Sequence, residues 1–141
     1  MATRSTIGIE HEDGTISAIY CHWDGYFGHH APILLNSYDT YDKAYALIAG
    51  GSLSILDNNI SPDPSAIHNF DEKQRGVCVY YIRDRGEPHV QNSAFIYDSF
   101  DDWVDDSINR HEEYNYLFTE GGWVARVGDT FYNELPAAPM A

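Results

Sequence analysis

The chain has 141 residues, a length suited to one domain, and its hydrophobic fraction of 43% sits beside an aromatic fraction of 14%. That much large apolar surface can build a core, which excludes disorder of the whole chain. The 22 Asp and Glu residues outnumber the 8 Lys and Arg residues, so the formal net charge is −14 at pH 7. A surface of this sign repels nucleic acid and anionic membranes and attracts basic proteins. We therefore expect a basic partner, no direct binding of nucleic acid and no membrane association. The alternative is that the acidity only keeps the protein soluble or suits a salty environment.

The first part of the chain predicts a β-hairpin over residues 5–21. Apolar residues alternate with small or polar ones, and the pair Asp13-Gly14 is typical of a tight turn. Residues 22–26 interrupt the alternation, and we expect them to form a loop in which Gly25 relaxes the backbone constraints.

A helical spacing of apolar residues replaces the alternation between residues 32 and 48. Asp39 or Thr40 can cap the main helix of this region, and Gly50-Gly51 ends it. A shorter helical piece over residues 32–36 is expected before it. The apolar face of the main helix contains Tyr41, Ala44, Tyr45 and Ile48.

The middle of the chain predicts a loop followed by a strand. Residues 57–71 are rich in Pro and Asn and show no period, so we expect a mobile loop. Residues 77–82 are apolar on both faces, which predicts a strand in the centre of the sheet. The polar residues 83–88 end this strand.

The last part of the chain predicts a second helix and a second hairpin. Ser99 precedes an amphipathic helix over residues 100–110, and Asp102 stands three positions later, as in a capping box. Residues 114–118 and 123–127 alternate on either side of a glycine-rich turn, which predicts an antiparallel pair.

The element order β-β-α-β-α-β-β predicts an α+β fold in which residues 1–141 form a single domain. We expect a roughly five-stranded antiparallel sheet with two helices packed on one face. The tail, residues 129–141, ends in Pro and Ala and is expected to be loose. No stretch approaches the ~20 apolar residues that a membrane span requires.

Seven carboxylates gather in and around the second predicted helix, where Arg110 is the only lysine or arginine. Helical side chains three or four positions apart lie about 5–6 Å from one another, close to the spacing of phosphates along one nucleic-acid strand. Such a ridge could occupy the basic groove of a nucleic-acid-binding protein. An ordinary solvated helix face is the alternative, since acidic residues also favour a helix N-terminus. The candidate partner-binding residues are Asp98, Asp101, Asp102, Asp105, Asp106, Glu112 and Glu113.

A second candidate site is a pocket for a small nucleotide. Arg83 and Arg85 stand at alternate positions, so in an extended chain their guanidinium groups share a face and can bind phosphate. Aromatic residues of the loop 22–26 could stack on a base. Alternatively, each arginine pairs with a nearby carboxylate and stabilises the end of the sheet. The candidate ligand-binding residues are His22, Trp23, Asp24, Tyr26, Arg83 and Arg85.

Cys21 and Cys78 are the only cysteines. Residues 1–6 lack the basic start and apolar run of a signal peptide, so we expect a reducing cytosol and two buried free thiols, with one disulfide as the alternative. Histidines lie near Cys21, but none of the spacings typical of a zinc site is present. We predict no metal, no cofactor and no catalytic residue. A hydrolase built on His22 and Asp24 is a further alternative.

Two blocks of the sequence, CHWDGY at 21–26 and RDRGE at 83–87, resemble a family of small, mostly uncharacterised bacteriophage accessory proteins. Ile82 departs from the family pattern, which has Gly there. The resemblance implies a phage origin and action in the cytoplasm of the bacterial host, and it implies no reaction. The segments that carry it are residues 2–10, 13–15, 19–26, 81–87 and 113–124.

These observations favour a non-enzymatic phage protein that binds and inhibits a basic bacterial host protein. The target would be a defence or nucleic-acid-handling factor, as for an anti-CRISPR or anti-restriction protein, and the acidic helix would act as a DNA mimic. A sponge that sequesters a small nucleotide signal is the main alternative, and a structural component of the virion is another. A homodimer is left open.

Overall fold

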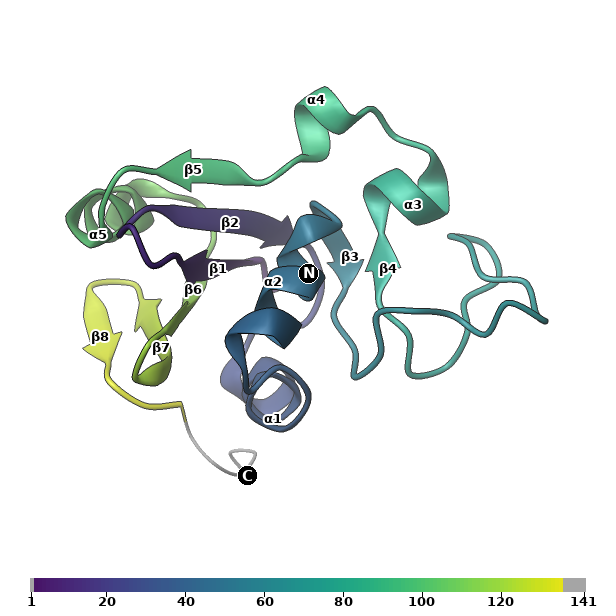
Figure 1. Ribbon diagram of the computed structural model, residues 1–141, viewed down its shortest axis with the longest axis horizontal. Coiled ribbons are helices and arrows are strands. Elements are labelled where there is room, and N and C mark those ends of the chain that lie inside the picture. Colours follow the sequence, from purple (N-terminus) through teal and green to yellow (C-terminus); the bar gives the residue numbers. More distant parts are fainter. Residues whose placement is uncertain (1, 136–141) are drawn as a thin grey trace.

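One mixed β-sheet organises residues 2–135, the part of the chain that this computed structural model describes (Figure 1). Its strand order is β4-β3-β2-β1-β6-β7-β8, and β5 pairs with β2 outside this path. The strands are β1 (Ser5–Glu10), β2 (Ile16–Cys21), β3 (Leu53–Ile55), β4 (Val79–Tyr80), β5 (Phe95–Tyr97), β6 (Tyr114–Thr119), β7 (Gly122–Val127) and β8 (Thr130–Tyr132).

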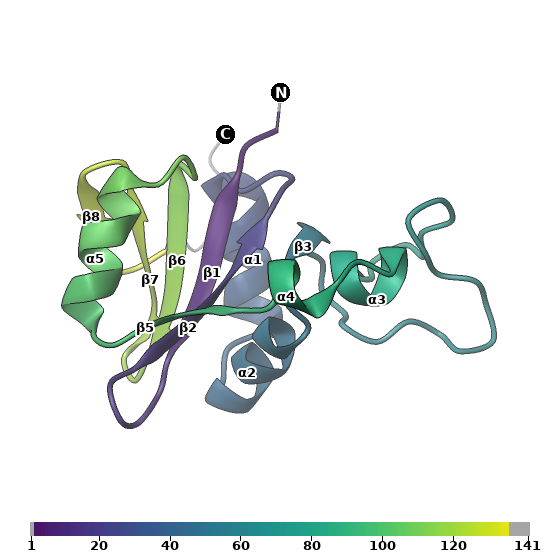
Figure 2. The ribbon, with the colours of Figure 1, turned by 90° about the horizontal axis from the view of Figure 1, so that it is seen from above.

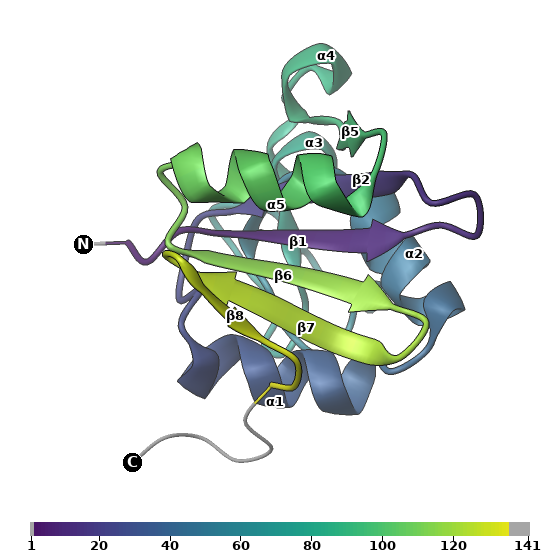
Figure 3. The same cartoon turned by 90° about the vertical axis from the view of Figure 1, so that its left-hand side faces the viewer.

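Helices cover both faces of this sheet. Figures 2 and 3 show α1 and α2 on one face and α5 on the other, while the short α3 and α4 lie beyond the end of the sheet that carries β3 and β4. Within residues 2–135 the helices are α1 (Phe27–Ser37), α2 (Tyr41–Ala49), α3 (Tyr81–Arg85), α4 (His89–Asn92) and α5 (Phe100–Asn109).

Both predicted hairpins are confirmed. β1 pairs antiparallel with β2, and β6 pairs antiparallel with β7, along their whole lengths. In the first turn the carboxylate of Asp13 accepts hydrogen bonds from the backbone N–H of Thr15 at 3.0 Å and from its hydroxyl at 2.7 Å. Gly14 takes a φ of 88°, a conformation that glycine adopts without steric cost.

The predicted caps of two helices are also confirmed. Thr40 caps α2 by accepting a hydrogen bond from the backbone N–H of Lys43 at 3.2 Å. Ser99 caps α5 by accepting one from the backbone N–H of Asp102, also at 3.2 Å. Each bond satisfies an amide of the first helical turn that has no partner within the helix.

Helix α1 is longer than the predicted piece at 32–36. It begins directly after Tyr26, whose side chain makes no capping hydrogen bond, so the sequence carries no recognisable start signal. Pro32 lies inside the helix, where proline is normally read as a breaker. Tertiary packing of buried Ile33 and Leu34 stabilises the helix despite these local features.

The α+β class is confirmed, but the prediction of a five-stranded antiparallel sheet is wrong in the number of strands and in two pairing directions. β1 and β6 run parallel, from Ser5 opposite Tyr114 to Ile9 opposite Phe118, and β2 meets β3 in parallel at Cys21. The chain crosses one face through α5 before it enters β6, and this crossover allows a parallel return. The additional strands have two or three residues each, too few for alternation to reveal them.

The prediction that the helices pack on one face is also wrong. Ile7 and Ile9 of β1 belong to the larger core, which α1 and α2 cover. Ile16 and Leu117 belong to a second cluster with Trp103 of α5. Because the central strands carry apolar side chains on both faces, a helix layer on each side is needed to exclude water.

The predicted strand at 77–82 contains only the two-residue β4 and lies at the end of the sheet path rather than in its centre. The carboxylate of Asp84 accepts a hydrogen bond from the backbone N–H of Tyr80 at 2.8 Å. This bond occupies an amide that a longer strand would use, and the next residues turn into α3.

The remaining segments are mostly irregular. Residues 57–71 contain no helix or strand apart from one isolated bridge, in agreement with the predicted loop. Strand β8 and buried Leu135 lie in the segment 129–141 that we expected to be loose, and residues 136–141 lie outside the described residues. None of the described helices is long and apolar enough to cross a membrane.

The contact between α2 and β4 predicts a specific effect of Gly50→Ala. A Cβ at Gly50 would overlap the ring of Tyr80, which cannot easily move because its hydroxyl donates to the carbonyl of Leu47 at 2.5 Å. We expect the variant to lower the free energy of unfolding by about 1–3 kcal/mol in urea titrations. Gly121→Ala is the control, since the nearest atom to its Cβ would be Oγ1 of Thr119 at 3.8 Å. Equal stability of the two variants would contradict this packing.

Candidate functional site

Helix α5 is anchored to the sheet by one face only. Trp103 is fully buried against Ile16 and Leu117, with Phe100 and Val104 packed around it. This arrangement follows from the apolar stripe in the sequence and leaves the opposite side of the helix in solvent. The predicted acidic residues lie on that solvent side or just outside the helix.

Four of the seven predicted partner-binding residues form what we call the anionic strip: Asp98, Asp101, Asp102 and Asp105. All four are exposed, and none of them makes a salt bridge within residues 2–135. Asp101 and Asp105 are one helical turn apart, so their carboxylates extend along one line of the helix. The strip therefore presents uncompensated negative charge to solvent.

The other three predicted residues are placed differently. Arg110 binds both oxygens of Glu112, at 3.0 and 2.9 Å, and also contacts Asp106 at 3.3 Å. Asp106 further accepts a hydrogen bond from the hydroxyl of Tyr97, whose pKa is raised by burial and by this bond. Glu113 lines a depression together with Arg4 and His111. Asp106 and Glu112 thus pair with Arg110 at the end of α5, whereas Glu113 is exposed beyond the helix.

The loop 22–26 presents two exposed aromatic side chains beside a fixed histidine. Trp23 and Tyr26 are more than 40% exposed, and Trp23 meets the ring of His22 edge-on at 4.7 Å. Nδ1 of His22 lies 2.6 Å from the hydroxyl of Tyr20. Partial burial lowers the pKa of His22, and nearby Arg4 lowers it further, so the ring is held neutral near pH 7.

Arg83 is committed to the structure of its own segment. Its guanidinium binds both oxygens of buried Asp84 at 2.8 and 2.9 Å and donates to the carbonyls of Ile60 and Cys78. Arg85 contacts Glu87 at 3.3 Å and lies over the ring of Phe70. These contacts occupy most of the N–H groups of the Arg83 guanidinium, so few are free to bind a phosphate.

The loop 22–26 and the two arginines, Arg83 and Arg85, therefore do not form a single nucleotide pocket. Because Arg83 and Arg85 belong to α3 rather than to an extended strand, they do not share the face expected for alternate positions. Each arginine pairs with a carboxylate, as in the structural alternative. In the described chain no hydrogen bond or ring contact links either arginine to the loop 22–26.

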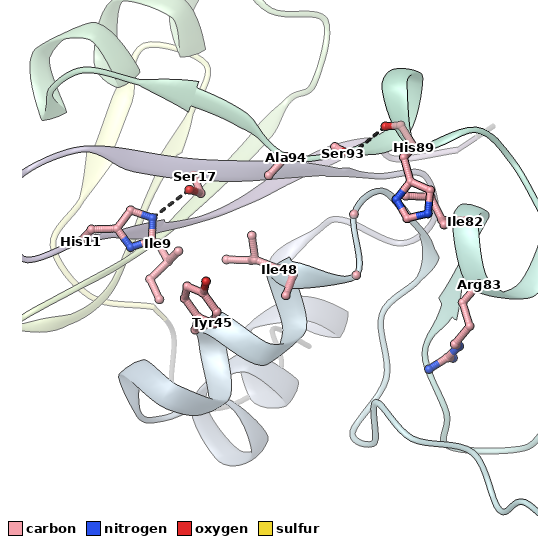
Figure 4. Close-up of a pocket in the computed structure, with 13 residues that line it drawn as sticks. Ile9, His11, Ser17, Tyr45, Ile48, Ile82, Arg83, His89, Ser93 and Ala94 are labelled. Atoms are coloured by element: carbon pink, nitrogen blue, oxygen red, sulfur yellow. Dashed lines mark hydrogen bonds between the residues drawn. The ribbon is translucent and has the colours of Figure 1, made fainter.

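A groove of about 340 Å³ lies between α2, strands β1 and β2, and the α3–α4 segment (Figure 4). Ile9, Ile48 and Ala94 supply apolar walls. Figure 4 shows His11, Ser17 and Tyr45 toward one end and Arg83 and His89 toward the other. Its volume is in the range of small-molecule sites, and only Arg83 among its polar residues was singled out by the sequence.

His11 and Ser17, at one end of the groove, form a hydrogen-bonded row with Tyr41, which lies outside it. Nε2 of His11 lies 2.8 Å from Oγ of Ser17, and Nδ1 lies 2.7 Å from the hydroxyl of Tyr41. A nucleophile, base and orienting group in this order are typical of hydrolases. Ser17, however, lies inside β2 between β1 and β5, where backbone amides serve strand pairing rather than an oxyanion. The row suits a scaffold for Tyr41 better than catalysis.

A second histidine is buried beneath the loop 22–26. His30 is fully buried, with Nε2 at 3.0 Å from Oγ of Ser5 and Nδ1 at 2.9 Å from Nδ1 of His29. Burial lowers the pKa of His30 well below its ordinary value, and neighbouring His29 lowers it further. Gly25 closes this cluster, because a Cβ there would overlap Ser5.

The two cysteines are buried and free, which confirms the expectation of free thiols. Burial raises the pKa of Cys21 to about 12, so its thiol is protonated and a poor nucleophile at neutral pH. Across residues 2–135, no group of three His, Cys, Asp or Glu side chains is placed to hold a metal ion.

No protein-family model matches this sequence, and comparisons with curated proteins and with solved structures also found no match.

The contacts of Arg83 predict that it stabilises the fold. Arg83→Lys loses the bidentate contact to buried Asp84. We therefore expect this variant to lower the free energy of unfolding by about 2–4 kcal/mol. Arg85→Lys alters an exposed pair and should cost less than about 1 kcal/mol. Urea titrations of both variants measure the difference. A nucleotide-binding role without a structural one would require Arg83→Lys to be as stable as the wild type.

The buried His30 predicts a loss of stability in mild acid. In the unfolded chain the side chain of His30 binds a proton near pH 6.5, the ordinary pKa of histidine. In the folded chain His30 binds that proton only at a lower pH. The contribution of His30 is thus complete above pH 6.5 and declines as the pH falls below it, by up to about 1.4 kcal/mol per pH unit.

His30→Gln should flatten this dependence between pH 7.5 and pH 5.5, measured as the free energy of unfolding at each pH. His89→Gln is the control, since His89 is exposed. An unchanged pH slope in His30→Gln would show that other groups are responsible.

Proposed function

We propose that this protein is a non-enzymatic inhibitor that binds a basic bacterial protein through the anionic strip on α5. The observation that carries the proposal is the set of exposed carboxylates at Asp98, Asp101, Asp102 and Asp105, which have no salt-bridge partner in the described chain. An isolated helix gains little from such a sequence, because like charges one turn apart repel each other. A basic groove would relieve this repulsion.

The nature of the strip favours a partner that normally binds nucleic acid. Carboxylates spaced by one helical turn lie about 5–6 Å apart and offer a row of negative charges to lysine and arginine side chains that contact phosphates. Association of this kind is guided by long-range attraction and weakens as salt screens the charges. The protein would then act as a DNA mimic and exclude nucleic acid from the groove.

The resemblance to small bacteriophage proteins supports a proposal about where in the cell the protein acts. We propose that the protein acts in the cytoplasm of an infected bacterium, where nucleic-acid-handling and defence factors with basic grooves would be its targets. Anti-CRISPR and anti-restriction proteins are the functional class that this proposal implies.

The test begins with co-purification of the tagged protein from bacterial lysate at low salt, followed by binding measurements between the two purified proteins. Asp101→Asn/Asp105→Asn should raise the Kd about tenfold at 0.1 M salt and flatten its salt dependence. Duplex DNA should compete with the wild-type protein for the partner.

Asp71→Asn/Glu72→Gln is the matched control. It also removes two exposed charges, from the loop between β3 and β4, which extends away from α5 (Figure 2). If the partner binds both double variants with equal affinity, or if DNA fails to compete, the anionic strip is not the binding surface.

A further inference from the structure

Two exposed tyrosines on α2 lie where two hollows in the surface meet. Tyr41 is 41% exposed and Tyr45 is 52% exposed, and their rings are stacked with centroids 6.0 Å apart and planes 29° apart. Tyr45 lines the groove of Figure 4, and Tyr41 lines a separate recess. His11 lines both hollows. Neither ring contributes to the buried core, so their packing calls for another explanation.

His11 fixes this aromatic pair in place. Its ring meets Tyr41 and Tyr45 edge-on, with centroids 6.1 and 6.2 Å away. Nδ1 of His11 is hydrogen-bonded to the Tyr41 hydroxyl at 2.7 Å, and Nε2 to Oγ of Ser17 at 2.8 Å. A surface whose rings are already oriented loses less entropy when it binds a ligand.

The recess beside Tyr41 has a volume of about 890 Å³ and is lined by Glu10, Glu12 and Glu120 from two different hairpins. The parallel pairing of β1 with β6 places both hairpin turns at the same end of the sheet, next to α2 (Figure 3). No lysine or arginine is among the residues that line the recess.

The charges around the tyrosines are not balanced by neighbouring cations. Within residues 2–135, no salt bridge involves the three glutamates of the recess, Asp13 or Asp42, and the nearby Lys43 is paired with Asp39 at 3.3 Å. The pKa of the Tyr41 hydroxyl is raised by desolvation first, then by Tyr45 and by the carboxylates of Asp13, Asp42 and Glu12. An electron-rich aromatic surface therefore lies in a field that attracts positive charge.

We propose that the stacked Tyr41–Tyr45 pair and the adjoining recess bind an arginine side chain of the partner protein. A guanidinium plane can stack on a tyrosine ring while its N–H groups bind carboxylates in pairs, which suits this combination of residues. A bare metal ion does not suit it, because no three carboxylate or imidazole groups of the described chain converge. The inference deepens the proposed function, since it names the partner's contacting group at a second surface.

The experiment uses a peptide, so it does not depend on finding the natural partner. A blocked pentapeptide with a central Arg between neutral residues is titrated into the full chain, and the tyrosine ring signals are followed by NMR at 0.15 M salt. The same pentapeptide with Lys or with neutral citrulline in the central position is titrated in parallel. We expect the Arg peptide to shift the signals of Tyr41 and Tyr45 and to bind at least about threefold more tightly than the Lys peptide.

Three variants separate stacking from charge. Tyr45→Leu should raise the Kd of the Arg peptide at least about threefold while it preserves the bond between His11 and Tyr41. Glu12→Gln/Glu120→Gln should raise it by a similar factor and weaken its salt dependence. Tyr26→Leu is the aromatic control, since Tyr26 is 44% exposed outside this surface. Thermal unfolding of each variant verifies that the fold is intact.

Binding that is lost in the recess variants but retained in Asp71→Asn/Glu72→Gln and Tyr26→Leu supports the inference. Equal binding of the Arg and Lys peptides, equal weakening in every acidic variant, or no binding at millimolar peptide overturns it. Loss of the anionic strip through Asp101→Asn/Asp105→Asn should leave Arg-peptide binding within twofold of the wild type. The proposed function can therefore fail while this inference stands, and the reverse also holds.

Discussion

The parallel pairing of β1 with β6 is the constraint on which the rest of the molecule depends. It joins the two hairpins of the chain into one sheet, and a buried hydrogen bond of 2.7 Å from Thr6 to Asn115 connects residues 109 positions apart in the sequence. Because the paired strands point the same way, the two hairpin turns lie at one end of the sheet. The same pairing requires the chain to return across a face, and α5 makes that crossing.

Local features of the fold could be predicted from the sequence, and long-range features could not. The hairpin turn at Asp13-Gly14 and the caps at Thr40 and Ser99 are specified by residues two or three positions away, which a pattern contains. The direction of β6 relative to β1 depends on partners more than a hundred residues apart. Strand β4 is an exception among the local features: the carboxylate of Asp84 binds the backbone N–H of Tyr80, four positions away, which apolar content alone assigns to a strand.

The same distinction between local and long-range features applies to the candidate site. The stripe that buries Trp103 and exposes Asp101 and Asp105 is a property of one helix, so the exposure of these two carboxylates could be predicted from periodicity. The partners of Arg110 could be anticipated only in part, because the sequence shows its neighbours but not which of them it contacts. The helical spacing predicts Tyr41 and Tyr45 on the apolar face of their helix. Both rings are exposed instead: they stack on each other and meet the His11 ring, and the hydroxyl of Tyr41 is hydrogen-bonded to His11.

The two acidic surfaces lie on opposite sides of the sheet, but they approach each other at one end of it. Tyr97, just before α5, pairs with Ile16, just after the first hairpin turn, so the N-terminal end of α5 begins beside that turn (Figure 3). Asp101 therefore lies toward the same end of the sheet as Glu12 and Glu120. A basic partner that approaches this end meets negative charge on both flanks, and the aromatic pair adds a contact that depends on geometry more than on salt. Charge can bring the partner in from a distance, whereas the fixed tyrosine rings discriminate among the cationic groups that arrive.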